Sequence, residues 1–376
     1  MSQPTASVRA SPARGDLSAP SWRLLLRPVG IYVASRVAVL LAFWLAVRLT
    51  PELPDTHVFL FWDSNLYVQL IEHPYLPDPA DRGVYAFFPL FPLLAHGLSV
   101  GLDIGALEAG LAVGALAGVA SAVALWCLCR RLLGTEVADR AVALYAFFPA
   151  SFVLSALYAE GVMIALSAAC LWALVSRQWL LAGVLAALGT ASRPNAVALI
   201  AACVWASGAA LWTRREWRSL VAPALAPLGI LGFFALLRVR TGSWRTWFDI
   251  ERDLWQEKFT LTAMRDHWNY FWGAPFANTN TTVVMIGAVL CILGLVLLVR
   301  ARLPAVLTVY CVVVIALAAC SQTLGPRPRF VMTAFPLFFV FALHLPRSAF
   351  SAVLGLSATL LGGLALMTVS TLLFTP

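Results

Sequence analysis

Long apolar runs alternate with short polar segments along most of the 376-residue chain. The runs are rich in Ala and Leu and lack the two-residue alternation of a half-buried strand, so they predict helices. A helix needs about 20 apolar residues to cross a bilayer. The pattern predicts about eleven such helices, near 29–49, 106–128, 140–155, 160–176, 178–192, 194–212, 219–239, 281–299, 304–320, 330–345 and 350–372. We therefore expect an all-α polytopic membrane protein.

The segment 85–102 is also apolar, but Pro89 and Pro92 interrupt it and are expected to kink any helix there. Arginines of the short loops fall on one side of the membrane only if this segment does not cross, which favours a re-entrant or interfacial helix. With that topology, residues 1–28 form a disordered cytoplasmic tail and 29–376 a single membrane domain. Two long loops, 50–84 and 240–280, then lie outside.

Composition agrees with a membrane protein, because 61% of the residues are hydrophobic and 12% are charged, against about 45–50% and roughly 25% in soluble proteins. The net charge of +8 comes almost entirely from arginine and is mostly explained by the positive-inside rule. No basic run is dense enough to indicate nucleic-acid binding. The seven cysteines form no CxxC pair, so they predict neither a metal site nor a disulfide framework.

The first outer loop holds Trp62 and Asp63 in an apolar and aromatic run, 59–70, whose spacing predicts an amphipathic helix at the membrane surface. Tyr67 belongs to the same run. A partly desolvated carboxylate among aromatic rings is a better base than one in water. The alternative is that Asp63 simply caps the helix.

Two further motifs lie at the ends of predicted spans. Glu160 follows a helix break at Phe148-Pro149 and is an acid at membrane depth, which is a functional-site hypothesis by default. Arg193 precedes Pro194 and Asn195, and Pro194 fits the first turn of the next helix. Arg193 beside the amides of that turn predicts an anion site. The alternative is a salt bridge between Arg193 and Glu160.

The second outer loop combines tryptophans with Gln256, Lys258 and His267, a combination that suits sugars but is also typical of interfacial anchors. Arg327 and Arg329 lie in a proline-rich segment at the outer mouth of a span. Two rigidly spaced arginines indicate a phosphate clamp, unless both are simply solvated.

In this order, the motifs resemble those of the PIG-V type mannosyltransferases, the family of GPI mannosyltransferase 2 and its bacterial relatives within the GT-C superfamily. The resemblance runs from residue 62 to residue 338 and departs from the family pattern at Ser64, Ala159 and Pro194. It rests on Trp62-Asp63, Phe87 to Pro92, Phe148 to Phe152, Ser155 to Glu160, Ser192 to Asn195, and Arg329-Phe330 through Phe335-Pro336.

The resemblance implies an integral-membrane enzyme that takes mannose from a polyprenyl-phosphate-mannose donor on the non-cytoplasmic face, with inversion at the anomeric carbon. It implies that Asp63 is the base and that loops 50–84 and 240–280 cap the active site. A phosphate leaving group needs cations rather than a general acid. The expected phosphate ligands are Arg193, Lys258, Arg327 and Arg329, and the expected acceptor or sugar ligands are Trp62, Tyr67, Glu160, Asn195, Gln256 and His267.

The acceptor is expected to be a lipid-linked glycan, and the Arg- and Ala-rich composition indicates a bacterial plasma membrane. Membrane lipids are the other expected partners, no nucleic acid is expected, and no organic cofactor or metal site is assigned. A lipid or solute transporter is the first alternative, although no inverted repeat is visible. A non-catalytic subunit of a glycosylation complex is the second.

Overall fold

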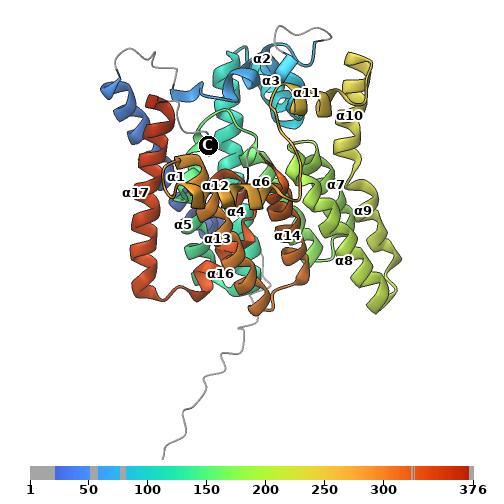
Figure 1. Ribbon diagram of the computed structural model, residues 1–376. Helices are drawn as coiled ribbons and strands as arrows, with labels where there is room; N and C mark the ends of the chain where they lie inside the picture. Colours follow the sequence, from blue (N-terminus) through green and yellow to red (C-terminus); the bar gives the residue numbers. More distant parts are fainter. Residues whose placement is uncertain (1–21, 51–57, 77–81, 323–324, 326, 372–376) are drawn as a thin grey trace, which may run out of the picture.

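The computed structural model describes residues 22–50, 58–76, 82–322, 325 and 327–371, and the regular elements of this part are helices (Figure 1). Six of them are long and apolar enough to cross a membrane, or seven if one bent pair is counted as a span. The six are Trp22–Leu49, Ala106–Leu133, Pro194–Arg214, Trp217–Thr241, Asn280–Arg300 and Arg347–Ser370. The chain is an all-helical polytopic membrane protein.

The bundle is built from α1 and a series of helices that begins at α4. In chain order its helices are α1 Trp22–Leu49, α4 Ala106–Leu133, α5 Thr135–Ala146, η3 Pro149–Ser155, α6 Glu160–Val175, α7 Trp179–Thr190, η4 Pro194–Val197, α8 Ala198–Arg214, η5 Trp217–Leu220, α9 Val221–Leu225, α10 Leu228–Thr241, α13 Thr279–Arg300, α14 Ala305–Cys320, α15 Pro328–Thr333, α16 Pro336–His344 and α17 Arg347–Thr371. The two long loops add α2 Ser64–Glu72, η2 Arg82–Ala86, α3 Leu90–Leu102, α11 Thr246–Asp253 and α12 Ala263–Gly273.

Each of the eleven predicted segments contains helix, but several helices are shorter than predicted. The apolar helices α6, α7 and α14 have 16, 12 and 16 residues, whereas a straight span of about 30 Å needs about 20. Length and composition therefore support six or seven spans, and the count of eleven stays a prediction. The predicted break at Phe148-Pro149 is confirmed, because α5 and η3 meet there at an angle of 78°.

Two boundaries differ from the sequence prediction. Helix α1 begins at Trp22, so residues 22–28 of the predicted tail are helical, while 1–21 lie outside the described residues. Pro89 and Pro92 do not kink a helix; they occupy the N-cap and first turn of α3. A proline is tolerated there because the first N–H groups of a helix have no carbonyl partner within it.

Close approach of α1 and α6 to α4 fixes the centre of the bundle. A Cβ atom at Gly118 of α4 would lie 1.8 Å from the hydroxyl of Tyr32, and one at Gly161 of α6 would lie 3.2 Å from the backbone nitrogen of Gly118. Small residues allow helices in a membrane to pack this closely. Gly161 follows Glu160, so this contact also positions the first turn of α6.

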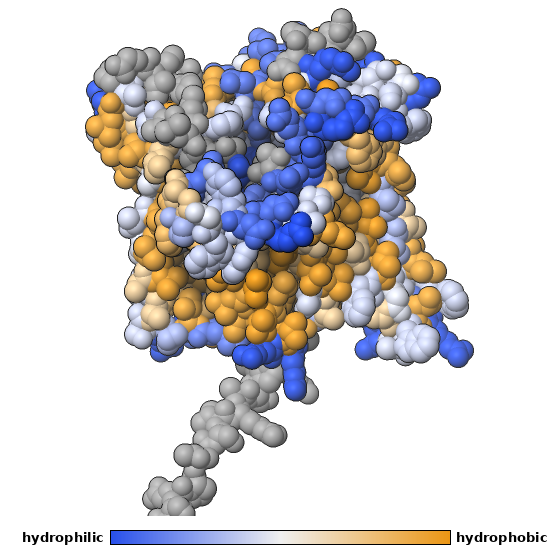
Figure 2. Space-filling model, in the orientation of Figure 1, coloured by the Kyte–Doolittle hydropathy of each residue, from blue (hydrophilic) through white to orange (hydrophobic). Residues whose placement is uncertain are grey.

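The loop helices α2, α3 and α11 gather at one end of the molecule, shown at the top of Figure 1. The 13-residue α3 is about 20 Å long, which is too short to cross the hydrocarbon core by itself. Figure 2 shows a broad apolar band on this face, with hydrophilic side chains above it and along the lower rim. Exposed apolar side chains such as Leu41, Leu116 and Ile292 belong to the membrane-facing helices.

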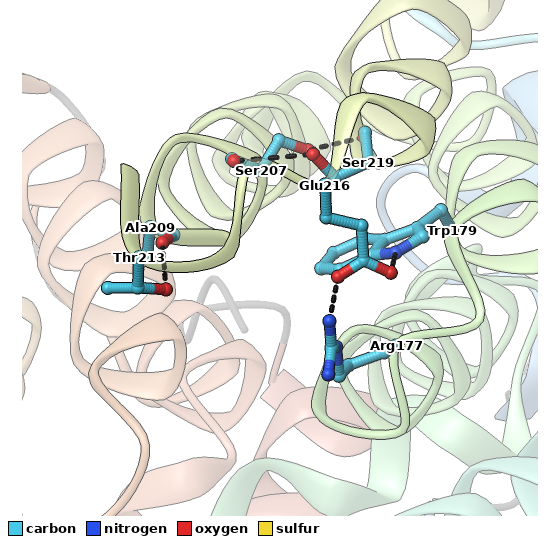
Figure 3. A network of polar contacts seen from close by, with 7 residues as sticks. All are labelled: Arg177, Trp179, Ser207, Ala209, Thr213, Glu216 and Ser219. Carbon is cyan, nitrogen blue, oxygen red and sulfur yellow. Dashed lines mark hydrogen bonds and ion pairs between the residues drawn. The ribbon is translucent and has the colours of Figure 1, made fainter. Parts of the chain in front are cut away.

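Ion pairs and hydrogen bonds tie the helix ends at the opposite, lower side. Figure 3 shows one such network, in which Glu216 pairs with Arg177 and accepts a hydrogen bond from Trp179 Nε1 at 2.8 Å. Beside it, Ser207 Oγ donates to the carbonyl of Ser219 at 2.6 Å, and Ser219 Oγ donates back to the carbonyl of Ser207 at 3.3 Å. These contacts bind α6, α7 and α8 together.

Candidate active site

Asp63 lies immediately before α2, in the N-cap position. Its side chain makes no capping hydrogen bond, and instead accepts a hydrogen bond from Arg329 Nη1 at 2.9 Å. The preceding residue, Trp62, has a φ of 49° and an exposed side chain. Leu66 and Tyr67 of α2 are buried and anchor the helix. Asp63 is therefore held as a partner of Arg329, not as a helix cap.

Arg329 comes from α15, at the other end of the chain. Arg327 is extended and Pro328 occupies the first helical turn, which sets the start of this short helix. The side chains of Arg329 and Asp63 are 7% and 17% exposed. The Arg329 guanidinium also lies 5.7 Å from the ring centre of Tyr158 and 5.1 Å from that of Phe330. The planar guanidinium of arginine suits a position between aromatic rings better than the ammonium of lysine would.

A second ion pair joins Glu160 and Arg193, whose nearest side-chain atoms are 2.9 Å apart. Glu160 is 1% exposed and Arg193 12% exposed. Pro194 occupies the first turn of η4, as predicted, and Arg193 precedes it in an extended conformation. The salt bridge predicted as one of two alternatives is thus present. This salt bridge does not exclude an anion from the site, because it uses Nη1 of Arg193 and the guanidinium has other N–H donors.

Tyr67 and Tyr158 join the two ion pairs. Tyr67 interacts electrostatically with all four charged residues, and Tyr158 with Asp63, Arg329 and Glu160. The two rings lie 6.5 Å apart. Burial is the main cause of the raised pKa of Tyr67, so its hydroxyl keeps its proton at neutral pH. The four charges and two phenols form one cluster, hereafter the Asp63 site.

Several buried polar atoms around the Asp63 site have no partner within the described part of the chain: Ser64 Oγ, Asn195 Oδ1 and Arg329 Nε. The amide of Asn195 is used on one side only, where Nδ2 donates to Thr333 Oγ1 at 3.1 Å. Buried polar atoms without partners are uncommon and costly, so they need an explanation. A polar ligand at this site would supply the missing hydrogen bonds.

The second outer loop adds a polar group beside the arginines. Glu257 is buried and accepts a hydrogen bond from the backbone nitrogen of Gln322 at 3.0 Å. Burial first, and then the charge of Arg327, lowers the pKa of His267. Arg327 in turn interacts with Arg329 and Glu257. The structure thus brings His267 and Arg327 next to the Asp63 site, whereas Gln256 and Lys258 are exposed.

Glu251 of α11 was not among the predicted ligands, although it belongs to the same environment. Burial, together with the negative charges of Glu257 and Asp63, raises its pKa to about 7. In the sequence it stands within the charged run 249–253, where nothing distinguishes it from a solvated residue. Tyr158 was also missed as a ligand, although it lies within a predicted motif.

An apolar groove of about 430 Å³ lies between α12 and α13. It is lined by Trp268, Phe271, Trp272, Phe276, Thr282, Met285, Ile286, Val289 and Leu290. Trp268 of the groove directly follows His267 in α12. One wall of the groove is therefore next in sequence to the residue that interacts with Arg327. No group of three or more His, Cys, Asp or Glu side chains arranged to hold a metal ion occurs among the described residues.

Residues 91–239 match the family model described as dolichyl-phosphate-mannose-protein mannosyltransferase. The matched region extends from α3 to α10, contains Glu160, Arg193 and Asn195, and ends before Glu251. Asp63 and Arg329 lie outside it. No curated protein matches the chain. The match covers less than half of the chain and shows a similarity to mannosyltransferases that depend on a polyprenyl-phosphate sugar.

Proposed function

We propose that the chain is a PIG-V type mannosyltransferase that moves mannose from polyprenyl-phosphate-mannose to a lipid-linked glycan on the non-cytoplasmic face of the plasma membrane. The observation that carries this proposal is the 2.9 Å ion pair between Asp63 and Arg329. It joins the first and the last motifs of the resemblance, which are 266 residues apart in the sequence. A purely structural role would not require a base and a cation to meet at the loop-bearing end.

The proposed reaction is a single displacement. The acceptor hydroxyl oxygen forms a bond to the anomeric carbon of mannose, while the bond from that carbon to the phosphate oxygen breaks with its electron pair. Asp63 takes the proton of the acceptor hydroxyl. Because the displacement is a single step, the configuration at the anomeric carbon inverts. Polyprenyl phosphate leaves as an anion, so no proton donor is needed for the leaving group.

Cations are needed where negative charge develops on the phosphate. Arg329 and Arg193 stand in the Asp63 site, and Arg327 lies next to Arg329. A guanidinium group can bind phosphate in a planar, bidentate geometry. Lys258 has an exposed side chain, so we assign the phosphate to the three arginines.

The groove between α12 and α13 supports a donor with a long apolar chain. Its lining is almost entirely hydrocarbon and aromatic, and it opens on the surface of a membrane-spanning helix. His267 and Trp268 are consecutive residues of α12, so a chain in the groove would bring its phosphate towards Arg327. We assign the isoprenoid chain of the donor to this groove.

The test is transfer of radiolabelled mannose from polyprenyl-phosphate-mannose by the purified protein, with a panel of lipid-linked acceptors. The Asp63→Asn variant should lose about 10²–10⁴-fold in rate, the usual contribution of a positioned base, and should remain folded. Asp253→Asn is the matched control, because Asp253 is an exposed carboxylate of α11 that pairs with Arg252.

Near-normal transfer by Asp63→Asn would contradict the assigned base. A wild-type protein that transfers no sugar alone, but does so after a second protein is added, would contradict the proposed enzyme and indicate a non-catalytic subunit. Release of polyprenyl phosphate that depends on acceptor would exclude a transporter.

A further inference from the structure

Glu251 differs from the other carboxylates of α11 in its surroundings. Asp249 is half-buried and Asp253 is exposed, and both pair with Arg252. Glu251 is half-buried and makes no hydrogen bond or ion pair through its side chain with any residue that the structure describes. Its electrostatic neighbours come from three other segments: Glu257 after α11, Asp63 before α2, and Arg193 before η4.

The position of α11 does not depend on Glu251. Trp247, on the same helix, is buried, and its Nε1 donates to the carbonyl of Ala86 at 3.1 Å. Its ring meets that of Phe88 edge to face at 6.4 Å. Trp255, just after the helix, lies 6.2 Å from the ring of Phe87. These aromatic contacts dock α11 on the first loop and hold Glu251 near Asp63.

The environment of Glu251 in the folded protein disfavours its ionised form. Its pKa rises from an ordinary value of 4.5 to about 7, first through burial and then through Glu257 and Asp63, although Arg193 acts in the other direction. Because the folded-state pKa is raised, the protonated form is favoured in the folded protein. The stability contribution of this group therefore falls as the pH rises from about 4.5 through 7. A strained, unpaired carboxylate next to a base is typical of functional sites.

We propose that Glu251 is a sugar-binding residue of the active site, whose carboxylate accepts hydrogen bonds from hydroxyl groups of the transferred mannose. This inference rests on the proposed function. It extends the site from the first loop and the bundle to α11, so that the transferred sugar would be enclosed between Asp63 and Glu251. Hydroxyl donors would supply the hydrogen bonds that the carboxylate lacks in the free protein.

The first experiment measures KM and kcat for polyprenyl-phosphate-mannose between pH 5.5 and 8.5. For the wild type, KM should fall as the pH rises through about 7, because the ionised carboxylate is the better acceptor. Glu251→Gln should raise KM about tenfold at pH 8, the loss expected for a charge-assisted hydrogen bond, and should flatten the pH profile. Asp249→Asn, on the same helix, should leave both unchanged.

Thermal unfolding separates this role from a structural one. Glu251→Gln should unfold at the same temperature as the wild type at pH 5 and at a higher temperature at pH 8, because it removes a charge that the fold opposes. A structural residue would instead lose stability. An unchanged KM and pH profile, or a lower unfolding temperature at pH 8, would overturn the inference.

Donor binding keeps the two proposals distinguishable. Asp63→Asn should bind polyprenyl-phosphate-mannose without turning it over, and adding Glu251→Gln should weaken that binding about tenfold. Donor binding without transfer by the wild type would contradict the proposed function, while weaker binding after Glu251→Gln would still support the sugar contact. Equal binding by both variants would contradict the role of Glu251 alone.

Discussion

Arg36 lies midway along α1, at membrane depth, and has all its guanidinium N–H groups engaged. It donates to the backbone carbonyls of Ala146 and Ser151, to the hydroxyls of Ser151 and Ser155, and to Ser35 Oγ. Its guanidinium also lies 4.9 Å from the ring centre of Tyr32. Apart from Ser35 Oγ, these acceptors lie where α5 stops and η3 turns away. Arg36 therefore stabilises the bend that leads to Glu160.

Replacing Arg36 tests this account. Arg36→Met should lower the free energy of unfolding by about 1–3 kcal/mol for each buried acceptor left without a partner. It should also reduce mannose transfer, because the η3 bend sets Tyr158 and Glu160. The measurement is thermal unfolding in detergent, followed by the transfer assay.

Arg48→Met serves as the control for Arg36, because Arg48 is exposed on the same helix and, among the described residues, its guanidinium pairs only with the ring of Trp44. Equal stability of the Arg36 and Arg48 variants would contradict a stabilising role for Arg36.

The special environment of a polar residue was predictable from sequence only where the side chain stood in an unusual context. Asp63 among aromatic residues and Glu160 after a proline break were such cases. Arg36 could have been found, because a charge inside an apolar run is costly unless its donors are satisfied. Glu251 could not, since its effect depends on which face of α11 docks against the first loop. That docking is decided by tertiary contacts such as the hydrogen bond between Trp247 and Ala86, which are 161 residues apart in the sequence.

At the scale of elements, α12 and α13 form the groove assigned to the isoprenoid chain. Val289, 60% exposed on α13, lines the groove. Val289→Trp should fill part of it and displace about two CH₂ groups, each worth about 0.8 kcal/mol. KM for a long-chain donor should rise about tenfold, while a short-chain analogue should be used as before.

Val299→Trp is the matched control for Val289→Trp, because Val299 is 63% exposed on the same helix and lies outside the groove. An unchanged KM for the long-chain donor after Val289→Trp would show that the chain binds elsewhere.

Element boundaries followed from proline more reliably than from hydrophobicity. Pro149 and Pro194 both begin helical turns where the sequence indicated. The membrane-spanning count did not follow so directly, because α6 and α7 are apolar but short. Helix α6 begins at Glu160 and α7 ends at Thr190, shortly before Arg193, so the Glu160–Arg193 pair lies where both helices stop. A hydropathy profile does not show this pairing.

At the scale of the molecule, the two ends differ in chemistry. Asp63 precedes α2, which lies with α3 and α11 at one end, and the Arg177–Glu216 and Arg347–Glu136 pairs tie helices at the other. The arginine bias of short loops predicts that the second end faces the cytoplasm. The site would then face outward.

Cysteine labelling tests this orientation. Asp253→Cys should react with a membrane-impermeant maleimide in intact cells, and Glu136→Cys only after permeabilisation. The two positions are matched, since both side chains are 63% exposed. The native cysteines are buried or half-buried, so their background should be low. The reverse labelling pattern would place the site on the cytoplasmic side.

The pairing of Asp63 with Arg329 also has a consequence for biosynthesis. Asp63 leaves the ribosome early, and its counter-ion follows only after most of the helices have been made. Until α15 is inserted, the nascent protein has Asp63 but not the cation that holds it, and the cluster around Tyr158 is incomplete. A ribosome-bound chain therefore completes the Asp63 site only near the end of translation.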